Sequence, residues 1–339
     1  MIAIVALALG QTLYTDHGNP TPSEQRVLWM LNRARSDPFA EGTRLAIPGG
    51  ITESLTAGEA ARTFAQPPLA MNEKLRAGAR AYAQLMWDSN QFSHTVGGTT
   101  APGRMAAAGY ANLFNWAENL ATGSAHTAEN LEDNLMRDFS IPSRGHRTNM
   151  LDIYELDPGP PPQVDPGPRR EVGIGFLDAG SSKSNIFQFI LVQDFAEATG
   201  DAPFLVGSVY LDANNNNEYD LGEGLGGVDL TVTGASFHAL SGSAGGYAFP
   251  CPASGTRDVT ATSTSLPATV VVSRAFSSSN LLVDVRVAPQ ADGDADGLPD
   301  FWETRFGGGL AAGGDNDGDT FTNLAEFRGG SNPLVAGST

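Results

Sequence analysis

Acidic residues in the C-terminal segment, residues 290–339, follow a spacing that suits a hard divalent cation. Calcium takes about six to eight oxygen ligands from a short flexible loop, with a left-handed residue at the sixth position. One loop has acidic side chains at positions 1, 3, 5, 9 and 12, namely Asp292, Asp294, Asp296, Asp300 and Glu303. Gly297 stands at position 6. The spacing predicts a calcium site, against the alternative of a solvated acidic turn.

The same spacing occurs twice more. A second loop nearer the C-terminus has Thr320 at position 6, and its ligand positions hold Asp315, Asp317, Asp319, Asn323 and Glu326. A third loop, earlier in the chain, has Asn217 at position 6, and its ligand positions hold Asp212, Asn214, Asn216, Asp220 and Glu223. Because the third loop carries fewer formal charges, we expect it to bind calcium most weakly.

A second kind of chemistry is possible in the first two hundred residues. His94, Glu118, Asp138 and His146 stand out of an otherwise apolar pattern. Two histidines and one or two carboxylates are a workable ligand set for zinc, with open positions for water or substrate. The alternatives are hydrogen-bonded structural histidines, and a Glu118 that caps a helix or bridges to Arg147. Long segments separate these residues, so their spacing alone does not bring them together.

The elements that must position these residues are readable from helix and strand signals. Thr21, Pro22 and Glu24 form a capping box that predicts a helix ending before Pro38. Apolar residues at helical spacing predict a second helix from about residue 72 and a third from about residue 124. Residues 172–176 and 186–192 are rich in β-branched and aromatic side chains and predict paired strands, after a Pro-rich surface insertion.

The chain then changes character and divides into zones. Residues 203–288 contain short strands separated by Gly, Ser and Asn turns, which predicts an immunoglobulin-like β-sandwich with a calcium loop. Residues 290–335 form tandem EF-hand-like calcium repeats, and residues 21–200 form the first folded domain. Residues 1–20 are interpreted as a partial signal peptide and leader, because their apolar run lacks a basic start. A buried first strand is the alternative.

Composition narrows the class of partner. The formal net charge is -18 at pH 7, and Cys251 is the one cysteine. Such a charge repels phosphate backbones and anionic membrane surfaces, and a single cysteine excludes an intrachain disulfide. No run approaches the roughly 18 apolar residues of a membrane span. We expect no nucleic-acid partner and no membrane span.

The first domain resembles the CAP superfamily of cysteine-rich secretory, antigen 5 and pathogenesis-related proteins, in its bacterial disulfide-free form. The resemblance runs over residues 23–198 and rests on the segments 28–35, 92–94, 109–110, 117–120, 144–151, 172–175 and 192–195. It implies an α-β-α sandwich whose cleft collects two histidines and two glutamates and in several members holds a divalent metal.

Carried onto this sequence, the resemblance makes His94 and His146 the cleft histidines and Glu118 the first glutamate. The second glutamate has no clean counterpart. Asp138 is the best candidate, with Glu129 and Glu132 as rivals. The third calcium loop resembles the B-type repeats of bacterial surface adhesins, and the tail resembles thrombospondin type-3 and dockerin-like calcium repeats.

Together these features predict a secreted or cell-surface, multi-domain, calcium-stabilised protein. The leading hypothesis is a binding module whose His/Glu cleft takes an extracellular lipid, peptide or cell-wall fragment. Family members share the cleft without a shared reaction, so enzymatic activity stays open. One alternative is a zinc-dependent hydrolase with Glu118 as general base. The other is a purely structural surface protein.

Overall fold

The computed structural model describes residues 10–153, 168–200 and 202–337. The chain separates into two compact units, one of Arg26–Asp201 and one that combines Met1–Gln25 with Ala202–Thr339. Two predictions concern residues outside the described ranges: the apolar start of the leader and most of the Pro-rich insertion. Among the described residues, no helix is both long and apolar enough to cross a membrane. Each unit is described separately.

The first unit is built on a mixed four-stranded sheet. In spatial order its strands are β2 (Ala70–Met71), β4 (Glu171–Asp178), β5 (Phe189–Ala198) and β3 (Leu113–Gly123). β5 runs antiparallel to both β4 and β3, whereas β2 and β4 are parallel. β3 is therefore an edge strand of this sheet. Segments that pack on either face of the sheet can reach its side chains.

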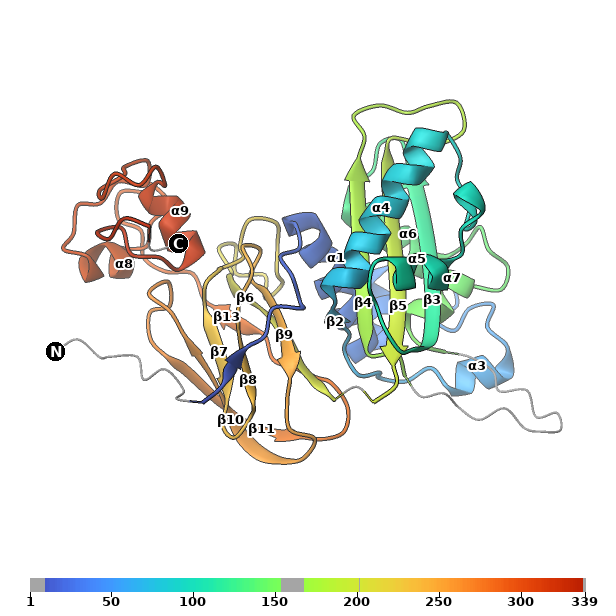
Figure 1. Ribbon diagram of the computed structural model, residues 1–339, viewed down its shortest axis with the longest axis horizontal. Helices are drawn as coiled ribbons and strands as arrows, with labels where there is room; N and C mark the ends of the chain where they lie inside the picture. Colours follow the sequence, from blue (N-terminus) through green and yellow to red (C-terminus); the bar gives the residue numbers. More distant parts are fainter. Residues whose placement is uncertain (1–9, 154–167, 201, 338–339) are drawn as a thin grey trace. The chain divides into compact units, whose positions relative to one another are not determined.

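Helices cover both faces of this sheet (Figure 1). One face packs Leu31, Leu135 and Phe195 in a core supplied by α1 (Pro22–Ser36), α6 (Ala128–Arg137) and α7 (Gly145–Met150). The other packs Tyr82 and Leu120 beneath α4 (Glu73–Ser89), with α5 (Ala101–Ala107) beside it. The shorter helices are α2 (Pro38–Arg44), α3 (Ala57–Ala61) and η1 (Val96–Gly98). The unit is therefore a mixed α/β structure.

Local signals position the helix starts as the sequence predicts. The backbone N–H of Glu24 donates to Thr21 Oγ1 at 3.3 Å, and Thr21 N–H donates to Glu24 Oε2 at 2.9 Å. This reciprocal capping box begins α1, and such a cap stabilises a helix by about 1 kcal/mol. Asn72 caps α4 with its side chain, which accepts from the backbone N–H groups of Lys74 and Leu75. Both predicted helices are confirmed.

The second unit is rich in strands, and residues 204–287 form two sheets. The five-stranded sheet runs β1 (Thr12–Leu13), β8 (Phe237–Leu240), β7 (Asp229–Val232), β10 (Gly255–Thr262) and β11 (Val270–Phe276). The other contains β12 (Leu281–Leu282), β6 (Phe204–Leu211), β13 (Val285–Val287) and β9 (Gly246–Pro250). The segment before α1 contributes β1, which lies outside the predicted boundaries of 203–288.

The C-terminal segment adds two short helices, α8 (Asp300–Arg305) and α9 (Asn323–Gly329). Trp302 and Phe327, which these helices carry, are buried in one hydrophobic cluster together with Leu230, Val259 and Phe276 of the strands. The C-terminal segment and the two sheets therefore share a core.

Candidate functional site

His94 and Glu118 meet on the α4 and α5 side of the sheet. Glu118 lies on β3, and its Oε1 is 2.6 Å from His94 Nδ1. The His94 side chain is 57% exposed, whereas Glu118 is 2% exposed. An ionised Glu118 accepts the proton on Nδ1, which fixes the ring and makes Nε2 the nitrogen that faces a ligand. The pair can bind a polar group or transfer a proton.

Arg104 of α5 neutralises Glu118 and was missed by the sequence analysis. Its Nη2 donates to Glu118 Oε2, and its Nη1 donates to the carbonyl of His94 at 3.1 Å and to Thr99 Oγ1 at 3.0 Å. The guanidinium also lies over the Tyr82 ring, 3.3 Å from its centroid. Glu118 therefore has its charge compensated before any ligand arrives.

Asp194 is a second acid at this site that the sequence analysis missed. It lies opposite Glu118 in the β3 and β5 pairing, is fully buried, and has no hydrogen-bond partner for either carboxylate oxygen among the described residues. Burial, reinforced by the negative charge of Glu118, holds the pKa of the Asp194 carboxyl well above its usual range. The available signal was the polar pair Gln193 and Asp194 inside an apolar central strand.

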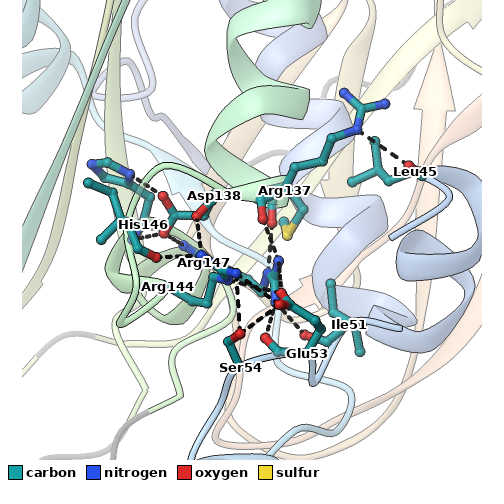
Figure 2. Close-up of polar contacts among 11 residues, drawn as sticks. Leu45, Ile51, Glu53, Ser54, Arg137, Asp138, Arg144, His146 and Arg147 are labelled. Carbon is teal, nitrogen blue, oxygen red and sulfur yellow. Dashed lines mark hydrogen bonds and ion pairs between the residues drawn. The ribbon is translucent and has the colours of Figure 1, made fainter. Parts of the chain in front are cut away.

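His146 belongs to a separate pair with Asp138 (Figure 2). Asp138 Oδ1 is 2.8 Å from His146 Nδ1, and Asp138 Oδ2 accepts the backbone N–H of His146 at 2.8 Å. Asp138 adopts a left-handed conformation, φ 53°, at the end of α6, which aims its carboxylate at α7. Asp138 therefore orients His146 and does not join Glu118.

The arginines beside His146 are structural partners of the preceding loop (Figure 2). Arg144 pairs with Glu53 through two hydrogen bonds of 3.0 and 2.9 Å. The Arg144 hydrogen bonds, followed by Ser54, lower the pKa of Glu53 to about 2. Arg147 is fully buried and donates to backbone carbonyls, including that of Ile51 at 3.0 Å. Both side chains are already engaged, so neither is available to bind an anionic ligand.

The four predicted cleft residues do not converge on one ion. Among the described residues, no three of His94, Glu118, Asp138 and His146 bring ligand atoms within 4.8 Å of one another. The reason is strand geometry: adjacent residues on β3 point to opposite faces, so Glu118 meets His94 while Asn119 donates to the carbonyl of His146 at 3.1 Å. As placed, the four residues form two separate pairs, His94 with Glu118 and His146 with Asp138.

A cleft of about 470 Å³ lies along β3 on the His146 side. Its lining includes Phe92, Leu120, Asp138, Phe139 and His146. The rival acids lie elsewhere on α6. Glu132 is buried and accepts from Gln193 at 2.6 Å, and Glu129 lies in the first turn. The cleft is large enough for a small ligand or a peptide segment.

The C-terminal segment contains two aspartate triplets that could hold a metal ion. They are Asp292, Asp294 and Asp296 in the first tail loop, residues 292–303, and Asp315, Asp317 and Asp319 in the second tail loop, residues 315–326. Within each triplet the carboxylate oxygens lie within 4.8 Å of one another. Position 6 is left-handed in both loops, with φ 97° at Gly297 and 81° at Thr320. The threonine therefore adopts the conformation expected of glycine.

The second tail loop has buried oxygens with no partner. Glu326 and Asn323 are fully buried, and among the described residues no hydrogen bond reaches Asp317 Oδ2, Asn323 Oδ1 or either carboxylate oxygen of Glu326. Burial, reinforced by the charges of Asp317, Asp319 and Asp315, raises the pKa of Glu326 to about 7. These atoms occupy positions 3, 9 and 12 of the predicted loop.

The first tail loop is organised similarly. Asp292 Oδ2 accepts the backbone N–H of Gly297 at 2.9 Å, and Asp300 Oδ1 accepts that of Gly293 at 2.8 Å. Burial and the charges of the neighbouring aspartates, led by Asp294, raise the pKa of Glu303. The loop therefore concentrates negative charge around Glu303.

The loop of residues 212–223, here the β-region loop, differs because its acids have partners. Asp212 is fully buried and accepts from Arg286 Nε at 2.5 Å and from the backbone of Asn217 at 2.9 Å. Glu223 accepts backbone N–H groups of Ala213 and Asp220 at 2.8 and 2.9 Å. Arg286, on β13, supplies the positive charge that pairs with Asp212.

Comparison with known proteins adds weak structural likeness. No family model matches the chain, and no curated protein matches it. Among solved structures, an extracellular protein with an SCP domain from Bacillus anthracis str. Ames aligns at 19% identity and TM-score 0.27, over 39% of this chain and 34% of that one. An outer surface protein of Borrelia burgdorferi aligns at 17% identity and TM-score 0.30, over 44% of this chain and 90% of that one. Likeness at this level assigns neither family nor function.

Proposed function

We propose that this chain is a secreted or cell-surface protein of CAP type whose tail loops bind calcium and whose α/β unit binds an extracellular ligand. The calcium part rests on Glu326, a fully buried carboxylate that no hydrogen bond from the described residues reaches at either oxygen. A buried carboxylate without a partner costs several kcal/mol, so a cation is the simplest completion of this loop.

The donor set favours calcium over other ions. All ligand positions of the two tail loops are carboxylates except Asn323, which offers an amide oxygen. Zinc prefers nitrogen and sulfur, and magnesium retains water and needs a tighter octahedron. Loops of this kind in extracellular modules have Kd values of about 0.1 to 1 mM, a calcium level that is met outside the cell. This affinity range is the argument for export.

Calorimetric titration of calcium into chelator-treated full chain tests this assignment. We expect heat from two tail sites in the wild type and loss of one in Glu326→Gln, which keeps the shape and removes the charge. Glu129→Gln, the same change on α6, is the matched control and should titrate like the wild type. Absence of binding at millimolar calcium, or unchanged binding in Glu326→Gln, contradicts the proposal.

The α/β unit supports a binding function more than a zinc hydrolase. Glu118 is already bonded to His94 and Arg104, so it is not a free general base, and His146 is bonded to Asp138. What remains for a ligand is exposed His94 and the cleft beside His146. A lipid, peptide or cell-wall fragment in the cleft would meet apolar walls and the oriented imidazole of His146.

Zinc titration of the calcium-saturated protein separates the two functions. The wild type and the His94→Ala/His146→Ala double variant should give the same heats. One tightly bound zinc in the wild type that disappears in the double variant would restore the hydrolase hypothesis.

A further inference from the structure

The second tail loop is physically joined to the β-region loop through α9. α9 begins at Asn323, contains Glu326, and continues into Arg328 and Gly329. The guanidinium of Arg328 donates to the carbonyl of Gly222, which lies in the β-region loop. The backbone N–H of Gly226 donates to the carbonyl of Arg328 at 2.7 Å. One short helix therefore carries two cation ligands of one loop and the anchors of the other.

Neighbouring contacts make this junction tight. Ser265 donates its hydroxyl to the carbonyl of Phe327, whose ring lies in the core shared with the strands. Thr264 Oγ1 donates to the carbonyl of Gly330 at 3.1 Å. At Gly227, φ 65°, a Cβ would lie 2.1 Å from the carbonyl oxygen of Gly329, so the two backbones meet where no side chain fits. A shift of α9 is therefore transmitted directly to the strands.

On the side of the β-region loop, the junction lies next to a predicted calcium-ligand position. Gly222 precedes Glu223, which occupies position 12 of the β-region loop and holds the backbone of Ala213 and Asp220. A cavity of about 450 Å³ is lined by Asp220 and Glu223 on one side and by Phe327 and Arg328 on the other.

We propose that cation binding in the second tail loop controls the order of the β-region loop through α9 and Arg328. This inference rests on the proposed calcium site and adds its regulation. Without a cation, repulsion among Asp315, Asp317, Asp319 and Glu326 loosens α9, and the contacts with Gly222 and Gly226 loosen with it. With a cation bound, α9 is held in place, and its contacts with Gly222 and Gly226 keep the β-region loop ordered.

Hydrogen exchange measured by mass spectrometry on the full chain tests the coupling, with calcium or with a chelator. In the wild type, calcium should slow exchange about tenfold in peptides covering residues 315–330 and also in those covering 212–226. In Glu326→Gln both effects should be lost. If calcium protects residues 212–226 equally in Glu326→Gln, or protects only residues 315–330 in the wild type, the coupling is overturned. If calcium protects neither segment, the proposed calcium site itself fails.

Arg328→Met tests the route. It keeps the apolar stem and removes the donor to Gly222, so calcium should still protect residues 315–326 while protection of residues 212–223 falls severalfold. Arg274→Met, an exposed arginine on β11, is the matched control and should behave like the wild type. Calorimetry on Arg328→Met is the accompanying check, and it should show that calcium still binds in the tail. Wild-type protection of residues 212–223 in a calcium-binding Arg328→Met overturns the assigned role of Arg328.

Discussion

The second tail loop and the β-region loop have the same ligand spacing, but among the described residues only the β-region loop has an arginine paired with one of its acids. Both adopt a left-handed conformation at position 6, with φ 81° at Thr320 and 64° at Asn217. In the β-region loop a distant arginine, Arg286, pairs with Asp212, whereas Glu326 in the tail has no partner among the described residues. In these two loops, the shared ligand spacing goes with the same backbone conformation at position 6. A residue far along the chain, Arg286, determines whether a loop acid is already neutralised without a cation.

The largest expected effect separates the two loops by affinity. Glu326→Gln should weaken calcium binding at its loop by about a hundredfold or more, since it removes a buried charged ligand; a hundredfold is about 2.8 kcal/mol at 1.4 kcal/mol per tenfold. The equivalent change at position 12 of the other loop, Glu223→Gln, should alter the total calcium affinity less than about twofold, because that loop binds weakest. Calorimetry on both variants measures this difference, and equal losses would remove the contrast.

Removing Arg286, the positive charge that pairs with Asp212, should make the β-region loop behave more like the second tail loop. Arg286→Met leaves Asp212 buried without its guanidinium, which should lower the free energy of unfolding in chelator by about 1 to 3 kcal/mol. Added calcium should restore part of that loss, because the loop then resembles the tail. Chemical denaturation with and without calcium measures both terms, with Arg274→Met as control. An Arg286→Met loss that calcium does not reduce would mean that the loop cannot accept an ion.

Acid should affect the two loops in opposite directions when no cation is present. The pKa of Glu326 is raised to about 7, so the protonated form is favoured in the fold and order in α9 should increase as pH falls from about 7 to 4.5. Burial acts to raise the pKa of Asp212, but Arg286 and the Asn217 N–H outweigh it and lower the pKa. Stability from Asp212 is therefore present above its unfolded pKa of about 3.8 and is lost as pH falls through its folded value.

Hydrogen exchange in chelator at pH 7, 5 and 3, corrected for intrinsic rates, checks these signs. Peptides from α9 should be more protected at pH 5 than at pH 7. Peptides from the β-region loop should change little over that interval and lose protection at pH 3. Parallel behaviour of both segments would contradict the assigned charge balance.

The smallest expected effect compares two buried acids of the α/β unit, Glu118, which has an arginine partner, and Asp194. Glu118 is paired with Arg104, whereas among the described residues no hydrogen bond reaches either carboxylate oxygen of Asp194, and burial raises the pKa of Asp194 well above its usual range, which favours the uncharged form. Asp194→Asn should therefore change the free energy of unfolding by less than about 1 kcal/mol at pH 7, and Glu118→Gln should cost about 1 to 3 kcal/mol. Thermal unfolding of both variants decides this; a costlier Asp194→Asn would mean that Asp194 is ionised.

Local signals made much of the fold predictable. The capping residues Thr21 and Asn72 and the β-branched strands near residues 172 and 190 determine element starts through neighbours a few residues away. The α/β character of the first unit and the strands of the second follow from those patterns. β1 was not predictable, since two residues near the start carry no strand signal and become one by pairing with β8.

The candidate sites were predictable only as far as the residues lie close in sequence. The two tail loops, which begin at Asp292 and Asp315, take all their predicted ligands from neighbouring residues in the sequence, so they were recognisable. The partners Arg104 and Arg286 come from other elements, and each is an ordinary residue in its own segment. Sequence spacing therefore indicated where carboxylates gather, and three-dimensional packing decided which of them are neutralised.

The most direct test of the central claim is the calcium content of the purified chain, measured by elemental analysis after gel filtration in buffer containing enough calcium to fill the tail loops. We expect two calcium ions per chain, one in each tail loop, falling to one in Glu326→Gln. No bound calcium would contradict the proposed tail sites. Three ions of equal affinity would contradict the distinction between the tail loops and the β-region loop.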